Sequence, residues 1–178
     1  GMAQRCPPGL FREGFAFERL PSFRVAKFKE LKEQLLANIT DPKLWLIGHD
    51  YDANVLDKAI ANAQRAELDT VIKFKQSDAT KFTAVAKLPG VVISNLPYGE
   101  RIGSMAELVN LHRSLGVGFK KHFNHWKLAL LGMDESLFKL LKLVKQKRYK
   151  FKNGPLDVEL NLYQLDDKQV SLTTDDKP

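Results

Sequence analysis

Four consecutive residues, Asn95, Leu96, Pro97 and Tyr98, follow a short apolar stretch and form the clearest chemical signal in the chain. The asparagine amide oxygen accepts hydrogen bonds, and so does the Leu96 carbonyl oxygen, which the next proline holds in an extended turn. Two such acceptors can bind the protons of a base's exocyclic amine and direct its lone pair toward a methyl donor. Tyr98 can stack on a flipped base. A plain turn would explain the asparagine and proline, but not the aromatic residue after them.

Two acidic loops precede this motif, and each follows a stretch that is typical of a buried strand. Asp50 can accept both hydroxyls of a ribose, with Tyr51 beside it, whereas Asp52 stands where a helix cap is expected. After the next strand, Asp78 can accept an adenine amine while the backbone near Ala79 donates to the ring. Asp78 alone is more typical of a turn. Because ligands bind beyond the carboxyl ends of strands in α/β sheets, the two loops together predict a nucleoside site.

A basic stretch near the C-terminal end of the chain has no acidic residue and is interleaved with Tyr149 and Phe151. Cations beside aromatic rings suit a nucleic-acid strand, through its phosphates and its bases. An exposed, solvated strand would explain the same residues equally well. We expect phosphate contacts from this stretch and from one arginine after the motif, namely Lys145, Lys147, Arg148, Lys150 and Arg101.

Hydrophobic periodicity predicts strands that alternate with helices. The helices are expected over residues 22–39, 53–67 and 104–122, with a short one after 134, and the strands over 44–47, 71–75, 90–94 and 127–131. Two further strands, 146–152 and 157–165, flank a turn at Asn153-Gly154-Pro155. This order predicts an α/β fold, in which a parallel sheet has helices on both faces and an antiparallel hairpin at its edge.

The composition narrows the class of protein. A chain of 178 residues suits one domain, and its net charge of +7 suits a polyanionic partner. Cys6 is the only cysteine and the four histidines lack ligand spacing, so no metal is expected. With neither a signal segment nor an apolar run near the ~20 residues of a bilayer span, a cytoplasmic location and no membrane are expected. We expect a lead segment over 1–21, the catalytic domain over 22–166 and a polar tail over 167–178.

The motif and its surroundings resemble a known family. Asn-x-Pro-Tyr is typical of amino-methyltransferases that act on adenine or guanine, and the longer string over 94–103 resembles the bacterial large-subunit ribosomal-RNA guanine-N2 methyltransferases of the THUMP-domain type (RlmL-like). The likeness continues, in order, over residues 6–10, 15–18, 48–52 and 149–154. It implies a Rossmann-like class I fold with S-adenosylmethionine as cofactor and ribosomal RNA as partner.

The same resemblance implies roles for individual residues. Asp50 would bind the cofactor ribose and Asp78 its adenine, with Tyr51 and Ala79 beside them. Asn95 would border both the cofactor and the target base, which residues 95–98 would hold.

Two departures from the family pattern leave alternatives open. Leu96 stands where the family usually has proline, and adenine dimethylases also carry Asn-Leu-Pro-Tyr, so adenine N6 in RNA or DNA is the alternative target. The family's first strand and its Asp-x-x-x-Gly-x-Gly-x loop are not found, and Gly116 and Gly118 lie inside a predicted helix. We therefore expect a gapped sheet, or one completed by self-association. A catalytically silent fragment or RNA-binding module is the third hypothesis.

Overall fold

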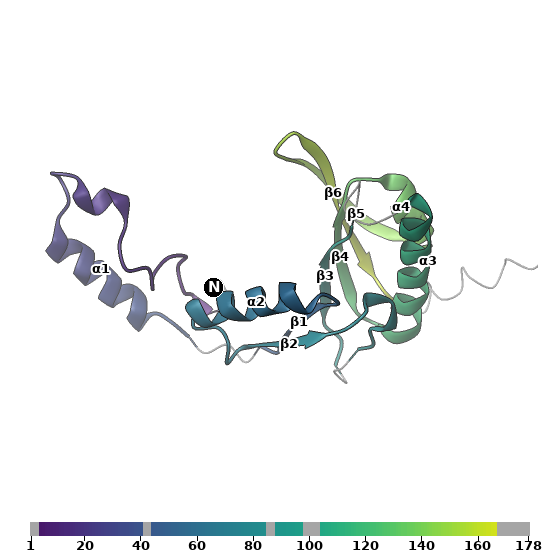
Figure 1. Ribbon diagram of the computed structural model, residues 1–178, viewed down its shortest axis with the longest axis horizontal. Helices are drawn as coiled ribbons and strands as arrows, with labels where there is room; N and C mark the ends of the chain where they lie inside the picture. Colours follow the sequence, from purple (N-terminus) through teal and green to yellow (C-terminus); the bar gives the residue numbers. More distant parts are fainter. Residues whose placement is uncertain (1–3, 41–43, 85–87, 98–103, 167–178) are drawn as a thin grey trace, which may run out of the picture. The chain divides into compact units, whose positions relative to one another are not determined.

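The computed structural model describes residues 4–40, 44–84, 88–97 and 104–166. The chain divides into two compact units, residues 1–76 and residues 77–178. Figure 1 shows the elements of each unit along the chain. Among the described helices, none combines the length and the apolar character needed to cross a membrane.

The first unit contains two α-helices and one pair of strands. Its elements are the 3-10 helix η2 (Ala16–Arg19), α1 (Val25–Ala37), β1 (Leu46–Asp50), α2 (Ala53–Arg65) and β2 (Ile72–Gln76). The strands β1 and β2 pair in parallel, and α2 contacts both of them. The helices and strands predicted for this part of the chain are therefore confirmed, with ends that differ by a few residues.

The strand β1 lies further along the chain than the sequence predicts. It begins at Leu46 rather than at residue 44, and it continues through Gly48 to Asp50. Gly48 pairs with Phe74 of β2, and a Cβ atom at Gly48 would lie only 2.9 Å from the Phe74 ring. The glycine therefore lets the aromatic ring lie against the backbone instead of ending the strand.

The second unit holds a four-stranded sheet and two helices. Its elements are η3 (Ala79–Lys81), β3 (Val91–Asn95), α3 (Met105–His122), β4 (Lys127–Gly132), α4 (Glu135–Leu140), β5 (Lys145–Asn153) and β6 (Leu156–Gln164). The strand order is β3-β4-β6-β5, with β3 and β4 parallel and the hairpin antiparallel. Gly154, at φ +62°, closes that hairpin. The described strands thus form two sheets, as the predicted gap requires.

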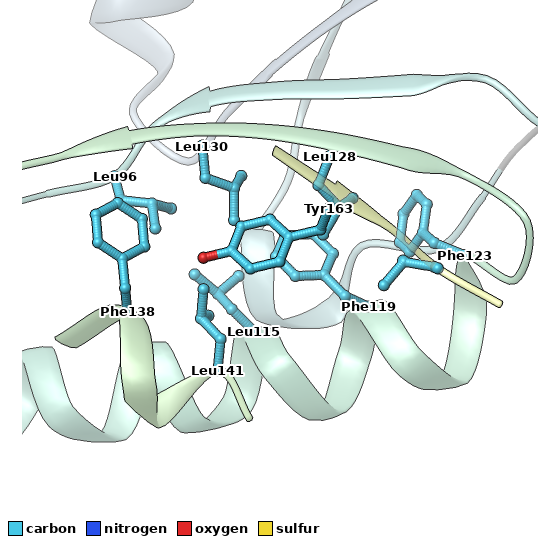
Figure 2. Packing of buried hydrophobic residues seen from close by; sticks show 10 residues of the cluster. Leu96, Leu115, Phe119, Phe123, Leu128, Leu130, Phe138, Leu141 and Tyr163 are labelled. Carbon is cyan, nitrogen blue, oxygen red and sulfur yellow. The ribbon is translucent and has the colours of Figure 1, made fainter. Parts of the chain in front are cut away.

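The helices α3 and α4 pack on one face of this sheet, which we call the covered face. Figure 2 shows Leu115 and Phe119 of α3, with Phe138 and Leu141, packed against Leu128 and Leu130 of β4. Both helices begin at side-chain caps. The Ser104 hydroxyl accepts from the Glu107 N–H while the Glu107 carboxylate accepts from the Ser104 N–H, and Asp134 accepts from the Ser136 N–H.

The opposite side of the sheet, which we call the open face, carries exposed apolar side chains. Ile93 is 79% exposed and Val91 is 57% exposed. The strand register places Leu160 and Leu162 of β6 on this same side. The side of β6 that faces the helices carries its polar residues, Glu159, Asn161 and Tyr163. Burial and the Glu159 charge raise the pKa of Tyr163.

Candidate active site

The Asn-Leu-Pro motif lies at the carboxyl end of β3, and Leu96 anchors it. Asn95 is the last residue of the strand and pairs with Leu131 of β4. The Leu96 N–H then donates to the Leu131 carbonyl oxygen at 2.8 Å, a bond that proline at this position could not make. The Leu96 side chain is only 4% exposed and lies beside Phe138 in the core (Figure 2). Main chain and side chain together hold Asn95 at the strand end, where its own side chain is exposed.

A small cavity of about 10 Å³ lies next to the motif, bordered by Leu96, Pro97, His112 and Asp134. It has room for about one water molecule, so it belongs to the packing that supports the motif. The ring of His112, which is 2% exposed, bonds through Nδ1 to the Leu108 carbonyl oxygen at 2.8 Å. The hydrogen bond from Ser136 holds the pKa of Asp134 below its usual value.

Two residues of the predicted site, Tyr98 and Arg101, lie outside the described residues. Their predicted roles in base stacking and phosphate binding stay predictions.

In the first unit, the loop after β1 is held by hydrogen bonds within the chain. One Asp50 carboxylate oxygen accepts from the Asp52 N–H at 3.0 Å. Asp52 accepts from the Asn54 N–H at 2.8 Å, which confirms its predicted role as the cap of α2. Gln76, at the end of β2, donates its side-chain N–H to the Tyr51 carbonyl oxygen at 2.8 Å. The sequence reasoning missed this bond between the two strand ends, because a glutamine at a strand end gives no distinctive signal.

His49 lies next to Asp50 in β1 and pairs in register with Lys75 of β2. Burial, together with the positive charge of Lys75, lowers the pKa of His49. The imidazole of His49 is therefore mainly neutral at neutral pH.

In the second unit, Asp78 caps the short helix η3, which the sequence did not predict. Its Oδ1 atom accepts from the Thr80 N–H at 2.8 Å and from the Thr80 hydroxyl at 2.7 Å. These bonds lower the pKa of Asp78, and Lys81 adds to the effect from 3.6 Å. Ala79 is exposed in the first turn of η3. The carboxylate that would bind adenine is therefore ionised and held in one orientation by its own turn.

The predicted basic strand is β5, and the pleat divides its cations between the two faces. On the covered face, Lys145 lies over the Phe138 ring at 5.8 Å, Arg148 pairs with Glu135 and Glu159 at 3.5 and 3.6 Å, and Lys150 pairs with Glu159 at 3.6 Å. On the open face, Lys147 lies 4.9 Å from the centre of the Tyr149 ring. The cations that looked alike in the sequence thus have different surroundings.

Within the ranges described above, no group of three or more histidine, cysteine or acidic side chains is arranged to hold a metal ion. The polar groups that follow the strands are carboxylate, amide and main-chain groups, and each of these suits hydrogen bonding to a nucleoside.

Comparison with known proteins identifies the family of this chain. A family model described as "RMKL-like, methyltransferase domain" matches residues 1–161. A relative from Pseudoalteromonas translucida, named ribosomal RNA large subunit methyltransferase K/L, is 89% identical over 177 residues, which are 99% of this chain and 25% of that protein. The chain thus spans about a quarter of the length of the curated relatives it matches.

Two solved structures extend the comparison. The crystal structure of SMU.472 complexed with SAH matches 91% of this chain and 42% of that chain, with 29% identity and a TM-score of 0.82. A protein from Listeria monocytogenes titled a predicted N6-adenine-specific DNA methylase matches 92% of this chain and 42% of that chain, with 26% identity and a TM-score of 0.79. These matches identify a class I methyltransferase fold. The chain therefore belongs to the family of RMKL-like methyltransferase domains.

Proposed function

We propose that this chain supplies part of the catalytic domain of an enzyme that transfers a methyl group from S-adenosylmethionine to the N2 amine of guanine in large-subunit ribosomal RNA. The position of Asn95 carries the proposal. Its backbone is fixed by pairing with Leu131, and the next residue is held in the core. The exposed side-chain oxygen can accept a hydrogen bond from the target amine, because the main chain of Asn95 and Leu96 is held in position.

In this mechanism, the side-chain oxygen of Asn95 and the Leu96 carbonyl oxygen accept hydrogen bonds from the two N–H groups of the amine. The lone pair of an exocyclic amine is delocalised into the base ring, and these hydrogen bonds localise that pair on nitrogen. After methyl transfer the nitrogen releases one proton to solvent. S-adenosylmethionine, when bound, supplies an electrophilic methyl group. The contribution of the protein is orientation and electrostatic stabilisation, as in other sites with preorganised hydrogen-bond partners.

The described residues suit the cofactor at its nucleoside end. One oxygen of Asp50 holds its own turn and the carboxylate has a second oxygen for a ribose hydroxyl. Asp78 is fixed in orientation by Thr80 and would accept the adenine amine, with Ala79 beside it. Tyr51 is 70% exposed next to Asp50 and would border the nucleoside.

The proposal extends to partners and organisation. The edge of β3, the outer strand of its sheet, would pair with another strand of the longer enzyme or of a second copy. Residues 22–166 would form the methyltransferase domain, between a lead segment over 1–21 and a polar tail over 167–178. A cytoplasmic location follows from ribosomal RNA as the substrate.

The test of the proposal is the identity of the methylated nucleoside. We expect ribosomal RNA from a strain lacking the gene to lose N2-methylguanosine, and we expect the gene to restore it. Mass spectrometry of digested large-subunit RNA measures both changes. Unchanged N2-methylguanosine in that strain would contradict the proposal.

Adenine N6 is the second candidate target. The name of the Listeria monocytogenes structure and the leucine at position 96 favour it. The same nucleoside digests separate the two candidates, because loss of N6-methyladenosine instead of N2-methylguanosine would identify adenine as the target.

We expect the 178-residue chain alone to bind S-adenosylmethionine only weakly. The sequence has no Gly-x-Gly loop after a strand to hold the methionine end. Isothermal titration calorimetry of this chain should detect no micromolar site, with the full-length Pseudoalteromonas translucida relative as the positive control. A clear micromolar site in the chain alone would rule out the silent-fragment hypothesis.

A further inference from the structure

The open face of the sheet carries a second group of residues suited to nucleic acid. Tyr149 and Phe151 lie two residues apart in β5, so they project from the same side of the strand. They are 42% and 45% exposed. The register pairs Tyr149 with Leu160 and Phe151 with Val158, so each aromatic residue lies opposite an aliphatic residue of β6.

The charge on this side of β5 is positive. Lys147 lies two residues before Tyr149, with its ammonium over the tyrosine ring. The covered face has the acidic partners, because Glu135, Glu159 and Asp157 pair with Arg148, Lys150 and Lys152 there. Three cations of the covered face therefore have acidic partners, whereas Lys147 adds its charge beside the exposed Tyr149 ring.

The register also relates these rings to the proposed target site. Asn95 pairs with Leu131, Leu131 with Leu160, and Leu160 with Tyr149, so the four residues form one row across the sheet. Three strand spacings place the two ends of this row about 14 Å apart. Tyr149 and Phe151 are separated by two residue rises, about 7 Å, which is twice the base separation in a duplex strand. An unstacked strand could thus place one base on each ring.

We propose that Lys147, Tyr149 and Phe151 form a stacking surface for unpaired RNA nucleotides that flank the target base at Asn95. Base stacking on exposed aromatic rings is tolerant of sequence and is a common way to hold single strands. Lys147 would exchange its contact with the tyrosine ring for an RNA phosphate. This inference rests on the proposed function, since it takes RNA as the substrate. It assigns recognition of the flanking nucleotides to the rings rather than to Arg148 and Lys150.

The test uses the 178-residue chain and a fluorescein-labelled single-stranded RNA of about twelve nucleotides, a length that fits known single-strand sites. We expect the double variant Tyr149→Leu/Phe151→Leu to bind this RNA at least about tenfold more weakly in fluorescence anisotropy. Leucine keeps the surface apolar, and circular dichroism confirms that the variant is folded. The variant Tyr149→Phe/Phe151→Tyr keeps both rings and should bind as the original chain does.

Salt dependence separates the rings from the cation. Lys147→Gln should reduce the slope of log affinity against log salt by about 0.7, the value for one phosphate contact to a single strand, whereas the leucine variant should keep the slope. Arg148→Gln/Lys150→Gln is the matched control. It should change RNA affinity less than the leucine double variant does and less than Lys147→Gln does.

Three results would overturn the inference: no RNA binding by the original chain, equal binding by the leucine variant, or a dimer that the leucine substitutions dissociate in analytical ultracentrifugation. The last would identify the surface as a contact with a second copy. None of them changes the methylated nucleoside, which tests the proposed function independently.

Discussion

Gly116→Ala should lower the free energy of unfolding by about 3 kcal/mol, the largest stability effect that we expect from a single methyl group in this chain. Gly116 lies in the middle of α3 and packs against the main chain at the end of α4. A Cβ atom at this position would overlap the carbonyl oxygen of Leu141 and lie 2.8 Å from its Cα atom. Leu141 is itself fully buried in the core. The clash therefore involves main-chain atoms, which cannot turn aside as the end of a flexible side chain can.

The same helix provides a matched control, Gly118→Ala. Its new Cβ atom would meet only the Thr80 carbonyl oxygen, at an ordinary 3.8 Å. Alanine in place of glycine inside a helix should then stabilise the protein by about 0.5–1 kcal/mol. Thermal unfolding should show Gly116→Ala melting about 6–12 °C lower, with Gly118→Ala unchanged or higher. Equal melting temperatures for the two variants would contradict the close approach at Gly116.

The substitution with the largest expected effect on activity is Asn95→Ala. Measured at the equivalent position of the full-length Pseudoalteromonas translucida relative, it should lower kcat about 100-fold, as the loss of one preorganised hydrogen-bond partner does in other enzymes. KM for RNA should change little, because the bond acts mainly on the amine that reacts. Single-turnover transfer of a radiolabelled methyl group to RNA measures the rate of this step.

Ser94→Ala is the matched control for Asn95→Ala. Ser94 precedes Asn95 in β3 and pairs with Leu130 on the covered face, so its hydroxyl points away from the side that Asn95 occupies. Activity should stay within about threefold of the original, a change that corresponds to less than 1 kcal/mol. If Asn95→Ala were as active as Ser94→Ala, the amine would not be bound at this strand end.

The sequence predicted the elements of the fold well because the periodicity of apolar residues is local. The predicted cap at Asp52 is confirmed, since a cap depends on only three or four neighbouring residues. The end of β1 was predicted too early, because a glycine such as Gly48 is typical of a strand end when only its neighbours in sequence are considered. Its real role depends on Phe74, which is 26 residues away and pairs with it across the sheet.

The residues of the candidate site remain a prediction, and the sequence did not predict the surroundings of several of them. Strict alternation along β5 would place Lys145 on the same side as Lys147, Tyr149 and Phe151. A bulge between Lys145 and Lys147 moves Lys145 to the covered face, and the residue types at this point do not predict a bulge. Similarly, the two hydrogen bonds from Thr80 that fix Asp78 follow from a short helix that lacks an apolar period.

The division of charges between the faces of β5 has a consequence for the divergence of this family. Arg148 and Lys150 share Glu159 as an acidic partner, so a neutral residue at 159 would leave Arg148 with Glu135 alone and remove the ion pair of the neighbouring Lys150. These three positions should therefore covary among related sequences. Lys147 has no such constraint from the covered face, and it should vary with the nucleic acid that each enzyme modifies. Within β5, the residues that face the helices would thus change together and more slowly, whereas Lys147 on the open face would change more freely.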